Sequence, residues 1–279
     1  MVTHCIPSNP IHFFGFLSRS PETLFAWPDL QETASCRSSK IPILAANLHI
    51  VMHDINALQR RIQEEITQLR LPESPANLYD PIRYMLEIGG KRVRPLLVLL
   101  AADLFGIPKI DDALPAALAV EFFHNFSLVH DDIMDNAPLR RGQQTIHKKW
   151  SGDVAILSGD NLLILAYTQL ACCQSDKLPA LLDAFNTMAT EVCEGQQLDM
   201  DFENTTAVGI NDYLRMIRLK TSVLLGTALQ MGAILADADE TDARLIYEFG
   251  VNLGLAFQLQ DDILDVYGDP GEFGKQQGG

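Results

Sequence analysis

The sequence predicts an all-α protein, and three observations support this prediction. Apolar residues recur at intervals of three and four, as in the series Ile55, Leu58, Ile62, Ile66 and Leu69, and this spacing places them on one face of a helix. No segment shows a convincing strand pattern. Several helical segments are apolar on most faces, which is typical of helices at the centre of a large bundle.

Glycine and proline divide the chain into its helices. The first helix begins at His53 and is expected to end at Pro72 and Pro75, and the second follows the candidate cap Asn77 and ends at Gly89-Gly90. Further helices are expected over residues 95–105, 111–135, 153–173, 178–203, 210–236 and 239–267. Gly250 and Gly254 would let a neighbouring helix approach the last of them closely.

Residues 1–51 differ from the rest of the chain because they carry Pro, Ser and Phe without a helical period. They match neither form of targeting peptide clearly. We therefore expect an unstructured N-terminal extension, followed by one helical domain over residues 52–279.

The overall charge and the cysteines exclude several classes of function. The chain has 36 acidic and 21 basic residues and a formal net charge of −15, which argues against nucleic acid or an anionic membrane as a partner. No apolar run reaches the length of a membrane span. Five cysteines without metal-ligand spacing indicate reduced thiols. We expect a soluble, cytoplasmic protein in which any bound phosphate meets a local cluster of basic residues.

Two copies of one acidic pattern are the most informative motif. They are Asp131-Asp132-Ile133-Met134-Asp135 and Asp261-Asp262-Ile263-Leu264-Asp265. Each puts two carboxylates at i and i+4, on one face of a helix, within an apolar segment where a charge needs compensation. Mg²⁺ binds through one or two carboxylates plus substrate phosphates, so the two copies predict a metal cluster around a phosphorylated ligand. The alternative is a pair of solvated acidic patches.

Two basic clusters could supply the opposite charge. Gly89-Gly90-Lys91-Arg92-Val93-Arg94-Pro95 places three cations at a helix start, where backbone N–H groups also favour an anion. Arg140-Arg141-Gly142 directly follows the first acidic motif, and arginine is suited to bidentate phosphate contacts. Alone, each cluster would be interpreted as an ordinary solvated turn.

Other polar residues interrupt the apolar helices. Lys220-Thr221 lies in one of them, although a lone lysine there is more often a snorkelling side chain. His124 stands two helical turns before Asp131, and alone it would be a core histidine bonded to a carbonyl group. Further interruptions are Gln196, Asp199 and Gln258.

In this order, the motifs resemble the trans-isoprenyl diphosphate synthase family, the farnesyl and geranylgeranyl diphosphate synthases (polyprenyl synthetases). The resemblance covers residues 52–279. It implies the all-α isoprenoid synthase fold, which is a large helical bundle around a central cavity, and a homodimer. It also implies a magnesium-dependent prenyltransferase that condenses isopentenyl diphosphate with an allylic diphosphate, head to tail and in trans, to give a short-chain isoprenyl diphosphate.

The resemblance assigns roles residue by residue. The isopentenyl diphosphate site maps to Lys91, Arg94, His124 and Arg141. The allylic diphosphate site maps to Arg140, Lys220, Thr221, Gln258 and Lys275, of which Lys220, Thr221 and Gln258 are expected to act in catalysis. Mg²⁺ maps to Asp131, Asp135, Asp261 and Asp265, with three ions per active site that Mn²⁺ can replace.

In this family the depth of the apolar cavity below the first acidic motif sets the product length. Phe126 is the fifth residue before Asp131, Ser127 is the fourth, and Phe123 lies a further turn down the helix. A ring at the fifth position resembles short-chain synthases, and the absence of both an aromatic residue at 127 and a two-residue insertion in the motif favours a C20 product, with C15 next. Ordinary helix packing by Phe126 is the alternative.

Two other functions are compatible with part of the pattern. A class I terpene cyclase would keep the first acidic motif but normally carries a second metal motif of the Asn/Ser/Glu type. A non-catalytic subunit of a prenyl synthase usually loses its aspartate ligands. The chain ends a few residues after Gly274-Lys275, where family members continue with another lysine and further helices, so we expect the domain to be incomplete at its C-terminus.

Overall fold

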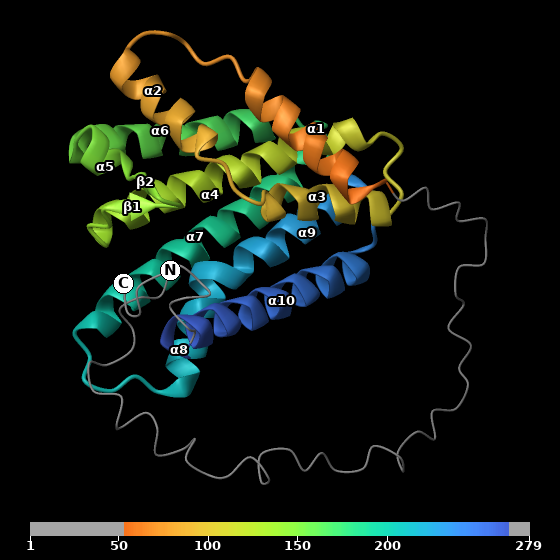
Figure 1. The fold of residues 1–279 in the computed structure, drawn as a ribbon. Coiled ribbons are helices and arrows are strands. Elements are labelled where there is room, and N and C mark those ends of the chain that lie inside the picture. The colour runs from red at the N-terminus through yellow and green to blue at the C-terminus, as the bar shows by residue number, and fades with distance from the viewer. Residues whose placement is uncertain (1–52, 268–279) are drawn as a thin grey trace, which may run out of the picture.

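The computed structural model describes residues 53–267, which form a bundle of helices (Figure 1). Residues 1–52, Lys275 and the side chain of Asp265 lie outside the described part, so the expectations about them stay predictions. In chain order the elements are α1 (Ile55–Gln68), α2 (Ala76–Glu87), α3 (Val93–Leu104), the 3₁₀ turn η3 (Ile110–Ala113), α4 (Leu114–Met134), β1 (Leu139–Arg140), β2 (Gln143–Gln144), α5 (Ile146–Lys149), α6 (Gly152–Leu170), α7 (Leu178–Glu203), α8 (Ile210–Ile217), the π-helical turn η4 (Arg218–Ser222), α9 (Val223–Leu235) and α10 (Glu240–Tyr267).

Helices α4 and α9 form the centre of the bundle. α4 packs mainly against α6 and α3, and α9 packs against α10, α3 and α7. In Figure 1, α7, α9 and α10 run side by side. Nearly every residue of α9 is buried, as expected for a helix that is apolar on most faces. Within residues 53–267, no helix combines the length and the apolarity needed to cross a bilayer.

The expected helices are present, with three differences. The expected helix 210–236 is divided by η4, where Ser222 donates a hydrogen bond from Oγ to the carbonyl oxygen of Ile217, five residues earlier, at 3.3 Å. The short helix α5 was not predicted. A hairpin of two-residue strands was also missed; its central residues, Arg141 and Gly142, both have positive φ (52° and 76°), as in a type I′ turn.

Three glycines allow helix backbones to meet around η4 and α9. A Cβ on Gly195 of α7 would lie 2.2 Å from the backbone nitrogen of Lys220, and one on Gly254 of α10 would lie 2.6 Å from the Cα of Ser222. A Cβ on Gly250 would lie 2.7 Å from the Cα of Gly226 in α9. The expected close approach at Gly250 and Gly254 is therefore present, and Gly195 was not singled out by the sequence.

We predict that Gly195→Ala destabilises the fold, because its methyl group would force α7 away from η4. Overpacking of this kind costs roughly 1–3 kcal/mol, which exceeds the gain of up to about 1 kcal/mol from the better helix propensity of alanine. Gly152→Ala is the matched control, since nothing lies within 4 Å of its Cβ position. Chemical denaturation should show a lower free energy of unfolding for the first variant only. Equal stabilities of the two variants would contradict the close contact.

Candidate active site

One cavity of about 730 Å³ collects most of the polar residues that the sequence singled out. Its walls come from the α2–α3 loop, the start of α3, α4, the β1–β2 hairpin, α7, η4, α9 and α10. Of the predicted site residues, it is lined by Lys91, Arg94, His124, Ser127, Asp131, Arg140, Arg141, Lys220, Thr221, Gln258 and Asp261. Asp135, Phe123 and Phe126 are not part of this lining.

The end of α4 presents Asp131 to the cavity and holds Asp132 against Arg140. The Arg140 guanidinium donates from Nε to both Asp132 oxygens, at 2.9 and 2.8 Å, and its Nη2 lies 3.4 Å from Asp131 Oδ2. Burial raises the pKa of Asp132, and the Arg140 guanidinium opposes that rise. Sequence reasoning missed Asp132, whose anchoring of Arg140 gives the hairpin a fixed position beside the acidic motif.

The Lys220 ammonium lies between two carboxylates. Its Nζ is 3.1 Å from Asp131 Oδ1 and 2.6 Å from Asp199 Oδ2. Burial lowers the pKa of Lys220, but the charges of Asp131 and Asp199 outweigh burial and raise it above its ordinary value. Lys220 is therefore a charged group that neutralises Asp131 at one carboxylate oxygen, while Arg140 contacts the other.

The first two aspartates of the second acidic motif, on α10, have the same two roles as Asp131 and Asp132. Asp261 lines the cavity. Asp262 is buried and accepts a hydrogen bond from Gln258 Nε2 at 2.9 Å and another from the Tyr213 hydroxyl. In each motif, the first aspartate faces the cavity and the second is held by neighbouring side chains.

The Gly89–Gly90 loop is fastened to α4 by a buried ion pair. Arg92, 7% exposed, has a left-handed backbone (φ 48°) at the start of α3. Its guanidinium pairs with Glu121 and donates to the carbonyl oxygen of Leu86 at 2.5 Å. Asn125 Nδ2 donates to Glu121 Oε1 at 3.0 Å. Glu121 and Asn125 were missed, although an acidic residue within an apolar helix was visible in the sequence.

Beside this ion pair lies an excess of positive charge. Arg94 Nη1 is 3.2 Å from His124 Nε2, and the Arg141 guanidinium lies against Gly90, where a Cβ would be 2.7 Å from its Nη1. Burial lowers the pKa of Arg94 to about 10, despite the opposing charge of Glu121. Burial and the charges of Arg140 and Arg92 lower the pKa of Arg141. Cations held close together in this way favour an anion such as a diphosphate.

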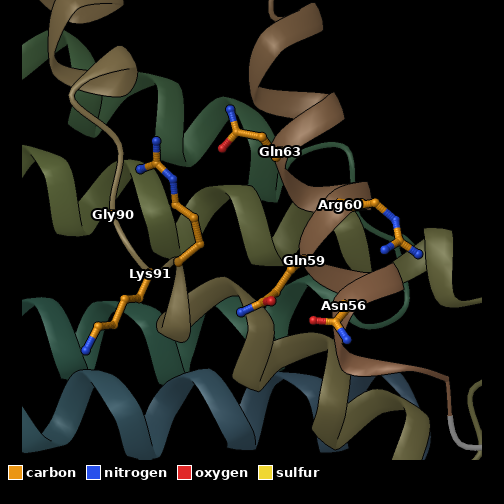
Figure 2. Close-up of a pocket in the computed structure, with 7 residues that line it drawn as sticks. Asn56, Gln59, Arg60, Gln63, Gly90 and Lys91 are labelled. Atoms are coloured by element: carbon orange, nitrogen blue, oxygen red, sulfur yellow. The ribbon is translucent and has the colours of Figure 1, made fainter.

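A smaller hollow of about 390 Å³ lies on the other side of the same loop, against α1 (Figure 2). Its lining comprises Asn56, Gln59, Arg60, Gln63, Gly90, Lys91 and Arg92. In Figure 2 the Lys91 side chain points away from Gln59 and Gln63. The α1 side chains therefore do not compete for the Lys91 ammonium.

The carboxylates suit a metal that arrives with its phosphate ligands. Among residues 53–267, no three His, Cys, Asp or Glu side chains are close enough to hold a metal ion alone. Mg²⁺, however, keeps several oxygen ligands from water and substrate phosphates and uses one or two carboxylates, which Asp131 and Asp261 supply. Burial and the charge of Asp131 raise the pKa of nearby Asp135 to about 6, as expected where carboxylates lie close together.

Aromatic rings pack around the part of α4 that precedes the first acidic motif. The Phe123 ring lies 5.5 Å from that of Phe126 and 5.3 Å from that of Phe185, measured between centroids, and the Phe126 ring lies 4.8 Å from His130. Phe185 of α7, fully buried, was not predicted from the sequence because it lies far from the acidic motif in the chain.

We predict that His124 makes the fold sensitive to acid. Burial, then the charges of Arg94 and Arg141, lower its pKa well below 6.5. The folded chain therefore keeps His124 neutral while the unfolded chain binds a proton as the pH falls below about 6.5, so the free energy of unfolding falls with pH, by at most about 1.4 kcal/mol per pH unit. Between pH 7 and 5, the free energy of unfolding of His124→Gln, measured by chemical denaturation, should fall less steeply than that of the parent. Parallel losses would contradict a depressed pKa.

Comparison with known proteins identifies the family of this chain. The polyprenyl synthetase family model matches residues 75–279. A geranylgeranyl diphosphate synthase of Methanosarcina mazei is 39% identical over 233 residues, 83% of this chain and 72% of that protein. A geranylfarnesyl diphosphate synthase of Natronomonas pharaonis is 38% identical over 240 residues, 80% of this chain and 70% of that protein.

Solved structures give the same result for the fold. A crystal structure of a geranylgeranyl pyrophosphate synthase is 53% identical and superimposes with a TM-score of 0.78 over 82% of this chain and 69% of that chain. A geranylgeranyl pyrophosphate synthetase from the archaeon Geoglobus acetivorans is 37% identical and superimposes with a TM-score of 0.74 over 80% of this chain and 74% of that chain. The predicted all-α isoprenoid synthase fold is thus confirmed, and the chain belongs to the polyprenyl synthetase family.

Proposed function

We propose that this chain is a magnesium-dependent prenyltransferase that condenses isopentenyl diphosphate with an allylic diphosphate, head to tail and in trans. The observation that carries the proposal is one cavity with two kinds of charge. The carboxylates of Asp131 and Asp261 line it together with the excess cations Arg94 and Arg141. The names of the similar proteins, geranylgeranyl and geranylfarnesyl diphosphate synthase, support the same substrate class.

The cation cluster is the proposed isopentenyl diphosphate site. Arg94 and Arg141 hold the diphosphate, with Lys91 at the exposed rim of the loop. His124 is kept neutral by its surroundings, so it donates a hydrogen bond without adding a further charge. The Arg92–Glu121 pair fixes the loop so that Lys91 and Arg94 act from one rigid turn.

The allylic diphosphate is proposed to lie against Arg140, Lys220, Thr221 and Gln258. Asp131, Asp135, Asp261 and Asp265 would hold the magnesium ions, which when bound neutralise charge on the departing diphosphate. As the C–O bond breaks, the Lys220 ammonium stabilises the leaving group as well. Lys220 already carries its charge in the cavity, so no proton transfer is needed.

Carbon–carbon bond formation then depends on the exclusion of water. The isopentenyl double bond attacks the allylic carbocation, and the resulting cation loses a proton to the released diphosphate. The apolar part of the cavity wall, Leu128, Val192 and Leu224, keeps water from the carbocation. Because the second motif keeps its first aspartate in this cavity, no observation favours a cyclase or a non-catalytic subunit.

For the product, we propose C20, with C15 next. Ser127 of α4 lines the cavity, and Phe123, one helical turn earlier, packs against Phe126 and Phe185, so that the three rings form an aromatic layer. A growing chain would therefore stop at this aromatic layer.

We also propose a homodimer that buries the apolar face of α6. Its exposed side chains are Ile156 (45%), Leu157 (60%), Ile164 (59%) and Tyr167 (38%), and an apolar patch of this kind is typical of an interface. Sedimentation should show a dimer for the parent and a monomer for Leu157→Glu. A dimer in both would contradict the α6 interface.

The two-site assignment predicts different kinetic effects for two lysines. Lys91→Ala should raise the KM for isopentenyl diphosphate, whereas Lys220→Ala should mainly impair kcat and the use of the allylic substrate. Losing a desolvated phosphate contact costs roughly 2–5 kcal/mol, so an effect of about 30-fold or more is expected for the buried Lys220 and a smaller one for the exposed Lys91. Lys109→Ala, on an exposed lysine at the start of η3, is the control and should match the parent. If both variants affect both substrates equally, the two-site assignment is wrong.

The aromatic layer predicts the product length. Phe126→Ala should open the space below Ser127 and lengthen the product by one or more C5 units. Chromatography of the dephosphorylated products measures this, and Phe249→Ala, whose ring is exposed on α10, is the control. An unchanged product distribution in Phe126→Ala would show that this ring only packs the helix.

A further inference from the structure

The second acidic motif is connected to a helix that carries none of the predicted site residues. Asp262 accepts a hydrogen bond at Oδ2 from the hydroxyl of Tyr213, which belongs to α8, and another at Oδ1 from Gln258. Tyr213 does not line the cavity. Its hydroxyl therefore contacts the motif through Asp262 and from outside the cavity lining.

Helix α8 is well placed to set the position of α10. Its Met216 and Ile217 are fully buried and pack against Leu255 and Leu259 of α10, and against Leu198 and Phe202 of α7. The next residues along the chain form η4, which carries Lys220 and Thr221. One short helix thus contacts α10 directly and leads into the turn that carries the ammonium group of the cavity.

The geometry of an α-helix explains why a bond to Asp262 controls Asp261. Neighbouring residues are separated by about 100° around the helix axis, so Asp261 can face the cavity only while Asp262 faces α8. The Tyr213 hydrogen bond joins Asp262 to a second helix, α8, and so resists rotation of α10 about its axis, whereas Gln258 belongs to α10 itself and fixes only the orientation of the Asp262 carboxylate. Without the Tyr213 hydroxyl, this hydrogen bond between α8 and α10 is lost.

We propose that Tyr213 is a positioning residue that orients the second acidic motif toward magnesium diphosphate. This inference rests on the proposed function, since it assigns Asp261 to that ligand. Tyr213 touches neither substrate nor metal. Its effect is confined to the half of the cavity that α10 supplies, and the cation cluster around Arg94 and His124, on α3 and α4, does not depend on it.

The test is Tyr213→Phe, which removes only the hydroxyl. Calorimetry with inorganic diphosphate at saturating Mg²⁺ should show binding weakened by about tenfold or more, as for other hydrogen bonds to charged groups. Titration with isopentenyl diphosphate in EDTA should match the parent. Thr190→Val is the matched control, since it also loses one side-chain hydrogen bond, to the carbonyl oxygen of Asn186 at 3.0 Å, on an exposed side of α7; it should match the parent in both titrations.

A second variant, Asp262→Asn, keeps the proposal testable if Tyr213→Phe folds poorly, because it weakens the same contact from the other side. The two changes together should weaken Mg²⁺-diphosphate binding by less than the product of their separate effects. Parent-like Mg²⁺-diphosphate binding by Tyr213→Phe, or equal losses in both titrations, would overturn the positioning role. If the parent chain itself binds isopentenyl diphosphate but no Mg²⁺-diphosphate, the proposed function fails, and this inference fails with it.

Discussion

The ion pair network around Asp131 is the interaction on which the rest of the cavity depends. Asp131 of α4 contacts Lys220 of η4 and Arg140 of the hairpin, and Lys220 also contacts Asp199 of α7. Buried charges of this kind are costly to leave unpaired, by several kcal/mol for a broken pair. Four segments of the chain are therefore held in register by the need to compensate one carboxylate.

The same network determines how charge is distributed in the cavity. Lys220 and Arg140 neutralise Asp131, whereas Asp261 brings a further carboxylate to the cavity from α10, so this side of the cavity is short of positive charge. On the other side of the cavity, around His124, the positive charges of the arginines exceed the nearby negative charge. A diphosphate with its metal ions would supply both deficits, so the two halves of the cavity are complementary to one composite ligand rather than to either ion alone.

Local spacing made much of this site predictable from the sequence. The i, i+4 carboxylates, the basic turn at Lys91 and Arg94, and the position of His124 two turns before Asp131 all follow from helix periodicity and from residue type. Asp135 shows the limit of that argument, because it follows the last residue of α4, and the structure leaves it outside the cavity lining.

The contacts that sequence reasoning missed connect residues far apart in the chain. The pairs Arg92–Glu121 and Tyr213–Asp262 depend on which helices pack together, and no local pattern encodes this. The same holds for Gly195, whose role requires the backbone of η4 on the facing side, and for the π-helical turn itself. The hairpin was missed because its strands have only two residues each.

If the cavity is complementary to one composite ligand, binding of the diphosphate and of Mg²⁺ is thermodynamically coupled, and this coupling can be measured. Calorimetry would compare the dissociation constant of inorganic diphosphate in EDTA with its value at saturating Mg²⁺, in the parent and in Asp131→Asn. A coupling of about 1–3 kcal/mol or more between the two ions is expected for the parent, and it should largely disappear in Asp131→Asn. If the parent binds diphosphate equally well with and without Mg²⁺, after correction for the magnesium complex formed in solution, the carboxylates are not the metal side of a single site and the account is contradicted.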